Sequence, residues 1–317
     1  MKLIFFGTPG YVNPILDYLI ENENLIAVVT KSDKPAKRHL VTLPSGIKKN
    51  ALEKKIPIFT PENIQNQDFI SNLSDIKPDL AIVAAYGKIL PKKVLDIFPN
   101  GCINIHFSLL PKYCGAAPIQ WALINGEANT GITSFWMDEG MDTGRIISQK
   151  KIEIDKNDDT ISLQKKLIPI ALDVLKETLK KAKNEDKGIE QTGSKSYAPP
   201  LKKEDGKIIW EKSAEEIYCL VRGTKPWPGA YTEVQSSKFV VHSLKILDAE
   251  IVNQTNYLNS ESFTAGTVIA LEKNVGFVLK CGSGYLLVKS VQPASKNIMS
   301  AWAFLQGYNL KIGDKLG

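Results

Sequence analysis

The unbroken apolar run at residues 79–86, DLAIVAAY, constrains the fold of this chain more than any other stretch. Parallel sheets bury such strands on both faces, because helices cover both sides of the sheet. Similar short runs occupy residues 2–6 and 25–30, with a helix-length segment between them. Strands that alternate with helices in this way predict a doubly wound, mostly parallel α/β domain of the Rossmann-like type.

Caps, glycines and prolines place the other elements of this domain. We expect strands that include 131–137 and 145–154. We expect helices at 45–55 with Ser45 as N-cap, from Pro118 to Gly126, and at 161–183, capped by Thr160 and interrupted by Pro169. Residues 31–46 carry several cations and two prolines without an apolar period, which predicts an exposed basic loop.

The pattern changes in the last third of the chain. Residues 188–206 are polar and rich in turn residues, which predicts a linker between a first domain, 1–187, and a second, 207–317. In the second domain a capping box starts a helix that ends at Gly223. Short β-type runs and a Gly-Ser-Gly hairpin then predict a small β-barrel of five or six strands, best described as OB-like. The runs are 237–247, 265–271, 275–281 and 285–291, followed by a short helix from Ser300 to Gly307.

Composition narrows the class of protein. The chain has 317 residues, 43% hydrophobic and 23% charged, which suits an ordinary protein of two domains. It has no apolar run of the roughly 18 residues that a membrane helix needs and no signal peptide, so we expect a cytoplasmic protein. The four cysteines form no CxxC pair, so we expect no metal. Residues 193–317 hold 15 Lys and Arg against 11 Asp and Glu, which permits a polyanionic partner.

The chemistry lies at the end of one strand. Asn104 and His106 are two residues apart in an apolar run, so both point to one face of the sheet. The loop that follows is broken by Pro111, Gly115 and Pro118. Open α/β sheets place their active sites at this kind of strand-to-loop junction.

Asn104, His106 and the later Asp142 suit acyl transfer. An amide stabilises an oxyanion, an imidazole handles a proton near neutral pH, and a carboxylate orients the imidazole or takes a proton from an attacking amine. No serine or cysteine lies in a nucleophile motif, which favours direct attack on an activated acyl donor. From spacing alone the alternatives stay open, because His106 can be structural and Asp142 can be an ordinary turn acid.

Residues 104–127, NIHFSLLPKYCGAAPIQWALINGE, followed by GIT and MDEGMDTG, resemble the signature of the 10-formyltetrahydrofolate-dependent formyltransferases. The resemblance implies that Asn104, His106 and Asp142 are catalytic and that 10-formyltetrahydrofolate is the formyl donor. It implies two folate-contacting segments. One is SLLP (Ser108, Leu109, Leu110 and Pro111), and the other is AAYGKILP, whose backbone lines the pteridine pocket (Tyr86, Gly87, Ile89 and Leu90).

Four further segments are most similar to the branch of the family that formylates initiator methionyl-tRNA: FFGTP, DKPAKR, GTKPWPGAYTE and residues 292–317. This similarity implies that Arg38, with Lys34 and Lys37, contacts the tRNA and that the C-terminal barrel contacts phosphates. The expected product is N-formylmethionyl-tRNA for translation initiation, and we expect a monomer.

The chain departs from the family pattern at several positions, and two other interpretations remain. Cys114 stands where a basic residue is usual, Phe107 where a small residue is usual, and Gly10 where an acid is common. Lys37 and His39 replace usual glycines. One interpretation, which does not depend on these departures, is a formyltransferase that acts on an amino-sugar nucleotide with the same three catalytic residues. The other is a non-enzymatic folate- or RNA-binding relative, which the intact catalytic residues argue against.

Overall fold

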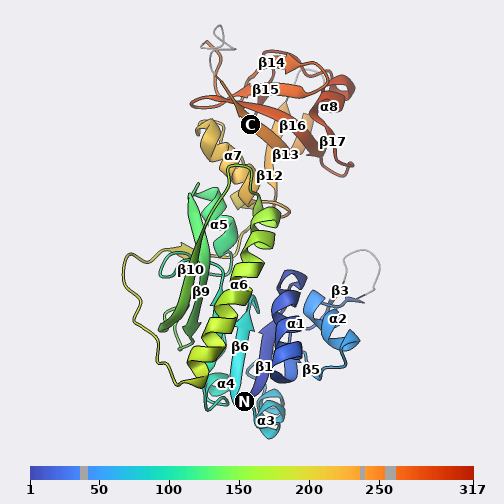
Figure 1. The fold of residues 1–317 in the computed structure, drawn as a ribbon. Coiled ribbons are helices and arrows are strands. Elements are labelled where there is room, and N and C mark those ends of the chain that lie inside the picture. Colours follow the sequence, from blue (N-terminus) through green and yellow to red (C-terminus); the bar gives the residue numbers. More distant parts are fainter. Residues whose placement is uncertain (36–41, 236–239, 254–261) are drawn as a thin grey trace. The chain divides into compact units, whose positions relative to one another are not determined.

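The computed structural model describes residues 1–35, 42–235, 240–253 and 262–317 (Figure 1). The chain forms two compact units. The first holds residues 1–118, 129–153 and 163–200, and the second holds 119–128, 154–162 and 201–317. The segment 188–200, which lies within the predicted linker, therefore belongs to the first unit. We describe each unit by itself.

A seven-stranded sheet forms the centre of the first unit, with strand order β10-β9-β7-β6-β1-β2-β5. Neighbouring strands from β7 to β5 pair in parallel, whereas β9 and β10 are antiparallel. This confirms the doubly wound, mostly parallel sheet. The strands are β1 (Lys2–Gly7), β2 (Asn24–Val29), β5 (Ile58–Phe59), β6 (Leu80–Ala84), β7 (Cys102–His106), β9 (Asn129–Trp136) and β10 (Ile146–Glu153).

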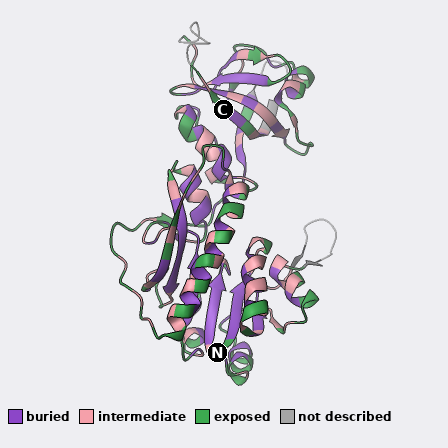
Figure 2. Cartoon of the chain, in the orientation of Figure 1, coloured by how far each residue is buried: buried purple, intermediate pink, exposed green. Residues whose placement is uncertain are grey.

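Both faces of this sheet are buried, as Figure 2 shows for β1 and β6. Ile4 and Phe6 pack in a core with α3, while Leu3 and Phe5 are equally buried on the opposite face. On β9 and β10 the sheet packs against α6, where Thr178 Oγ1 donates to Ser134 Oγ at 2.6 Å. The helical segments are η1 (Gly10–Val12), α1 (Asn13–Asn22), α2 (Gly46–Glu53), α3 (Gln67–Asp75), α4 (Lys92–Leu95) and α6 (Thr160–Lys183). Helix α5 (Pro118–Ile124) belongs to the second unit from residue 119 on.

Helix α6 differs from its prediction in two ways. It continues through Pro169 for 24 residues, because its apolar stripe is buried on both sides of the proline. Its N-terminal cap is Asp159, whose Oδ1 accepts from the backbone N–H of Ile161 and Ser162 at 3.0 Å. Thr160 instead donates its hydroxyl to the Gly223 carbonyl at 2.9 Å.

The second unit contains an antiparallel sheet of order β14-β15-β16-β13-β12-β18, with β17 paired to β16. Its two ends meet, because Val268 N–H donates to Asp314 O and Leu316 N–H donates to Gly266 O, both at 2.9 Å. The expected barrel-like domain is thus confirmed, although β12 was not predicted. The strands are β12 (Ala230–Gln235), β13 (Val240–Val252), β14 (Val268–Glu272), β15 (Gly276–Lys280), β16 (Tyr285–Pro293), β17 (Met299–Ser300) and β18 (Lys315–Leu316).

The predicted caps of the second unit are confirmed. Helix α7 (Ala214–Gly223) begins with the complete Ser213–Glu216 capping box, and α8 (Ala301–Tyr308) begins at Ser300, whose hydroxyl accepts from Ala303 N–H. A short 3-10 turn, η2 (Glu204–Gly206), precedes α7.

Two short strand pairs lie in segments predicted as loop or linker. β3 (Lys34–Pro35) pairs with β4 (Thr42–Leu43) inside the basic loop, and β8 (Cys114–Gly115) pairs with β11 (Tyr197–Ala198). Lys34 thus lies in β3, whereas Lys37 and Arg38 lie outside the described residues.

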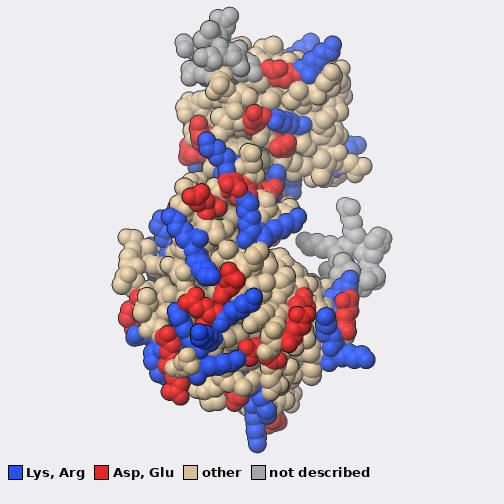
Figure 3. All heavy atoms as spheres, in the orientation of Figure 1, with Lys and Arg blue, Asp and Glu red and all other residues tan. Residues whose placement is uncertain are grey.

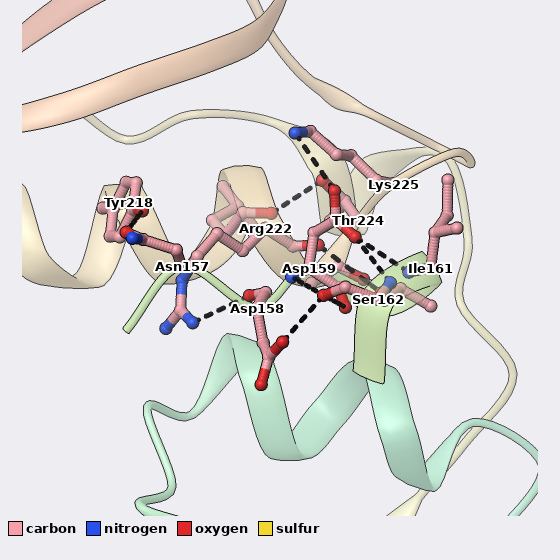
Figure 4. A network of polar contacts seen from close by, with 12 residues as sticks. Asn157, Asp158, Asp159, Ile161, Ser162, Tyr218, Arg222, Thr224 and Lys225 are labelled. Atoms are coloured by element: carbon pink, nitrogen blue, oxygen red, sulfur yellow. Dashed lines mark hydrogen bonds and ion pairs between the residues drawn. The ribbon is translucent and has the colours of Figure 1, made fainter. Parts of the chain in front are cut away.

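Within the second unit, Arg222 ties residues 154–162 to α7 (Figure 4). Its Nη1 donates to the carbonyls of Asp158 at 2.9 Å and Asp155 at 3.3 Å, and its guanidinium lies 5.0 Å from the centre of the Tyr218 ring. The residue is only 9% exposed. Both bonds come from one guanidinium nitrogen, whose two N–H groups each find a carbonyl.

We expect Arg222→Met to lower the free energy of unfolding by roughly 1–3 kcal/mol, since it leaves buried carbonyl groups without their donor. Urea denaturation measures this change. The control is Lys212→Met, because the Lys212 ion pair with Glu216 is exposed and contributes little. An Arg222→Met chain as stable as the control would contradict the assignment.

Candidate active site

Strand β7 brings the predicted polar pair to the carboxyl end of the sheet. Ile103 and Ile105 are fully buried on one face, so Asn104 and His106 share the other. Asn104 pairs in register with Val83 of β6 and Phe135 of β9, which fixes its position from both sides. His106 is buried, whereas Asn104 is partly exposed. Among the described residues, no hydrogen bond engages the Asn104 side chain, so its amide can receive a ligand.

The imidazole of His106 lies between two partners. Its Nε2 is 3.0 Å from the Tyr113 carbonyl, and its Nδ1 is 3.6 Å from Asp142 Oδ2. A carbonyl can only accept, so the proton of this bond lies on Nε2. A neutral ring with that proton presents a lone pair on Nδ1, so an ion pair with Asp142 requires the imidazolium. The two contacts therefore fix the orientation of the ring between the Tyr113 carbonyl and the Asp142 carboxylate.

Backbone geometry around the imidazole is unusual. Asp142 Oδ2 also accepts from Gly115 N–H at 2.7 Å. Both residues that contact the ring lie in the left-handed region, Tyr113 with φ 61° and Asp142 with φ 54°. Such conformations cost energy in residues other than glycine and persist only where surrounding contacts hold them. The two loops that orient His106 are therefore held in place by the fold.

Side-chain hydrogen bonds hold the predicted SLLP loop in place. Ser108 is buried, and its hydroxyl donates to Lys112 O at 2.6 Å. Thr133 on β9 bridges the loop, because its hydroxyl donates to Ser108 O at 2.7 Å and accepts from Leu110 N–H at 3.1 Å. The Leu110 side chain packs in a small core with Phe135, whereas Leu109 and Pro111 are half-buried. Folate contact by these four residues stays a prediction.

The second predicted folate segment follows β6. Tyr86 packs edge-on against Phe6 with ring centres 5.4 Å apart, and burial raises the pKa of its phenol to about 12. Leu90 is also buried, but Ile89 is 67% exposed. Gly87 has φ 71°, and a Cβ there would meet the Lys31 ammonium at 2.6 Å. Ile89 and the backbone are thus the parts of this segment that face outward, while Tyr86 and Leu90 belong to the core.

A cavity of about 780 Å³ lies between α4 and the turn at 137–140, which leads directly to Asp142. Leu95, Phe98, Cys102 and Met137 give it apolar walls. The size suits a drug-sized ligand. Sequence reasoning missed these residues, and its only signal for them was the acidic turn before Asp142. The cavity is also lined by Lys92, Asp96, Pro99, Gly101, Asp138, Glu139 and Gly140.

The departures from the family pattern have clear packing partners. Cys114 is fully buried, and its thiol lies 3.4 Å from the Pro111 carbonyl. Burial, and then the charge of Asp142, raise the pKa of this thiol. Phe107 meets the Tyr11 ring edge-on, with centres 5.5 Å apart. Position 114 is thus occupied by a buried thiol that donates to a loop carbonyl.

No three His, Cys, Asp or Glu side chains gather into a metal-binding group within the ranges that the structure describes. Among the helices of those ranges, none is both long and apolar enough to cross a membrane.

Comparison with known proteins covers the whole chain. The family described as formyl transferase matches residues 1–179, and the formyl transferase C-terminal domain matches residues 200–309. A methionyl-tRNA formyltransferase of Acetivibrio thermocellus is 41% identical over 100% of both chains. One of Thermodesulfovibrio yellowstonii is 43% identical over 98% of this chain and 97% of its own.

Solved structures share the fold at lower identity. HypX from Aquifex aeolicus in complex with tetrahydrofolic acid is 15% identical, with a TM-score of 0.65 over 99% of this chain and 50% of its own. WlaRD, a sugar 3N-formyl transferase, is 22% identical, with a TM-score of 0.63 over 93% of this chain and 98% of its own. With two domain matches and full-length relatives near 40% identity, the chain belongs to the formyl transferase family, among the methionyl-tRNA formyltransferases.

Proposed function

We propose that this chain transfers the formyl group of 10-formyltetrahydrofolate to the amino group of initiator methionyl-tRNA. The observation that carries the proposal is the arrangement at the end of β7. His106 contacts both the Tyr113 carbonyl and Asp142, and the Asn104 amide lies two residues earlier on the same face. Relatives named methionyl-tRNA formyltransferase match this chain along its full length.

The reaction needs a nucleophile, an oxyanion site and a proton acceptor. The amine lone pair of the methionyl ester attacks the formyl carbon, and the carbonyl electrons move to oxygen. The C–N10 bond then breaks with its electron pair on N10, which takes up one proton while the amine loses one. Tetrahydrofolate and the formylated ester are the products.

Asn104 and His106 are suited to the developing oxyanion. The amide donates without a change of charge, and His106, protonated or neutral, stabilises the oxyanion beside it. Asp142 keeps the ring oriented through Oδ2, which also holds Gly115 N–H. Its Oδ1 is left to accept the amine proton. Burial of His106 strengthens these interactions, because water does not screen them.

The cavity beside α4 supports folate as the donor. Its apolar walls suit a flat ring system, while Asp138 and Glu139 supply polar groups at the edge. It adjoins the turn that carries Asp142, so a ring held there would bring its formyl group toward the three residues. The outward-facing Ile89 would extend this contact along the predicted pteridine segment.

The tRNA would be held by separate features of the two units. Lys34, Lys37 and Arg38 of the basic loop are assigned to it by resemblance. In the second unit, Trp227 is 55% exposed and offers a ring on which a base can stack. Figure 3 shows cations and anions interspersed over the face in view, so a few positioned lysines would make the phosphate contacts. We expect the protein to act as a monomer in the cytoplasm.

We expect rapid formyl transfer to charged initiator methionyl-tRNA and little to charged elongator methionyl-tRNA. The assay follows the formyl group from 10-formyltetrahydrofolate to each tRNA and, in a third reaction, to a nucleotide-linked amino sugar. Transfer to the sugar alone would replace the proposed acceptor. Transfer to none of them, with folate bound, would favour the non-enzymatic interpretation.

We expect Asn104→Ala to lower kcat about 100- to 1000-fold, since loss of one oxyanion donor raises the barrier by roughly 2.7–4 kcal/mol. Steady-state kinetics measure the loss, and a fluorescence titration tests that folate still binds. Asn72→Ala is a control at an exposed amide on α3 of the same unit. Near-normal turnover of Asn104→Ala would remove this residue from the mechanism.

We expect the KM for tRNA to rise steeply with salt, because phosphate contacts release counterions when they form. The KM for the folate should change far less. Arg38→Ala should flatten the salt dependence by about one phosphate contact. A KM for tRNA that is insensitive to salt would argue against a nucleic-acid acceptor.

A further inference from the structure

Residues 189–198 run along the outside of the active-site loops, within the first unit. Most of this segment is exposed, including residues 192–195 and Tyr197. Three of its residues turn inward: Gln191 and Ser196 are half-buried, and Ala198 is fully buried. The sequence suggests only a polar linker, so the role of these inward-facing residues follows from their contacts.

Ser196 holds the loop whose carbonyl orients His106. Its hydroxyl accepts from Tyr113 N–H at 2.9 Å, and its carbonyl accepts from Cys114 N–H at 2.8 Å. Its own N–H donates to Pro111 O at 3.3 Å. Tyr113 is the residue that accepts from His106 Nε2. One serine therefore fixes the peptide groups on both sides of the His106 acceptor.

Gln191 holds the loop that carries Asp142. Its Nε2 donates to Asp142 O and to Gly144 O, both at 2.8 Å. Both carbonyls belong to the turn in which Asp142 has φ 54°. Within the described part of the chain, the buried Oε1 of Gln191 has no partner. The side chain is thus placed by its two donated bonds alone.

The close approach of the β11 and β8 backbones explains why residue 115 is a glycine. β11 pairs with β8, and a Cβ at Gly115 would lie 2.6 Å from Ala198 O. Gly115 N–H in turn donates to Asp142 Oδ2. Only glycine allows β11 to pack against the residue that holds the catalytic carboxylate.

We propose that Gln191 and Ser196 are positioning residues for the His106–Asp142 pair. The proposal rests on the proposed function, since it gives these residues a part in formyl transfer. Ser196 sets the Tyr113 carbonyl, and Gln191 sets the Asp142 backbone, so each controls one partner of the imidazole. Both partners have left-handed backbones that need outside contacts to persist. A shift of about 1 Å in reacting groups can cost a hundredfold in rate.

The kinetic test compares Ser196→Ala and Gln191→Ala with the conservative variants Ser196→Thr and Gln191→Glu. We expect each alanine variant to lower kcat about five- to a hundredfold while both KM values stay within about twofold. Threonine keeps the hydroxyl and should restore kcat. Glutamate should not restore it, because a carboxylate would face two carbonyls. Ser194→Ala and Gln65→Ala are exposed controls and should match the wild type.

Three results would overturn the proposal: unchanged kcat in both alanine variants, a rise in KM alone, or full activity of Gln191→Glu. Thermal midpoints of all variants separate positioning from unfolding, because each variant should stay folded at the assay temperature while kcat falls. If the wild type transfers no formyl group to any acceptor, it is the proposed function that fails.

A second measurement needs no activity. The chain has three histidines, so ¹⁵N spectra of the imidazoles are simple, and a His106→Gln variant assigns the signal of interest. We expect the Nε2–H signal of His106 to shift or broaden in Ser196→Ala and to stay unchanged in Ser194→Ala. An unchanged signal in Ser196→Ala would overturn the role of Ser196 whatever the activity.

Discussion

The contact of His106 Nε2 with the Tyr113 carbonyl fixes the orientation of the ring at the centre of the candidate site. It places the ring proton on Nε2 and turns Nδ1 toward Asp142. The ring is thereby held between a carbonyl and a carboxylate at the end of β7. His106 is buried at the end of β7, and its two polar partners, Tyr113 and Asp142, both have left-handed backbones.

Segments far apart in the chain hold the site together. The imidazole comes from β7, its acceptor from the loop before α5, and its carboxylate from the turn after β9. Gln191 and Ser196 then reach these loops from a segment dozens of residues later. A rigid sheet fixes the histidine, while loops supply its partners, a division of roles that is common at α/β active sites.

Local signals predicted most of the secondary structure. Capping at Ser45 and Ser213, the apolar run of β6 and the break at Pro118 each depend on a few neighbouring residues. Prediction was wrong where distant contacts decide. Helix α6 passes through Pro169 because its buried stripe outweighs the lost bond, and β12 forms because β13 and β18 pair with it.

The sequence by itself determined the type of fold and the candidate catalytic residues, because apolar period and residue chemistry are local properties. Residue chemistry grouped Asn104, His106 and Asp142, and the resemblance implied that all three are catalytic. Only the tertiary structure decided that Asp142 meets Nδ1, that Ser108 turns into its own loop, and that Gln191 and Ser196 hold the partners of the imidazole. These contacts join residues from four to 83 positions apart. No local pattern encodes such pairings, because the packing of the whole unit brings the groups together.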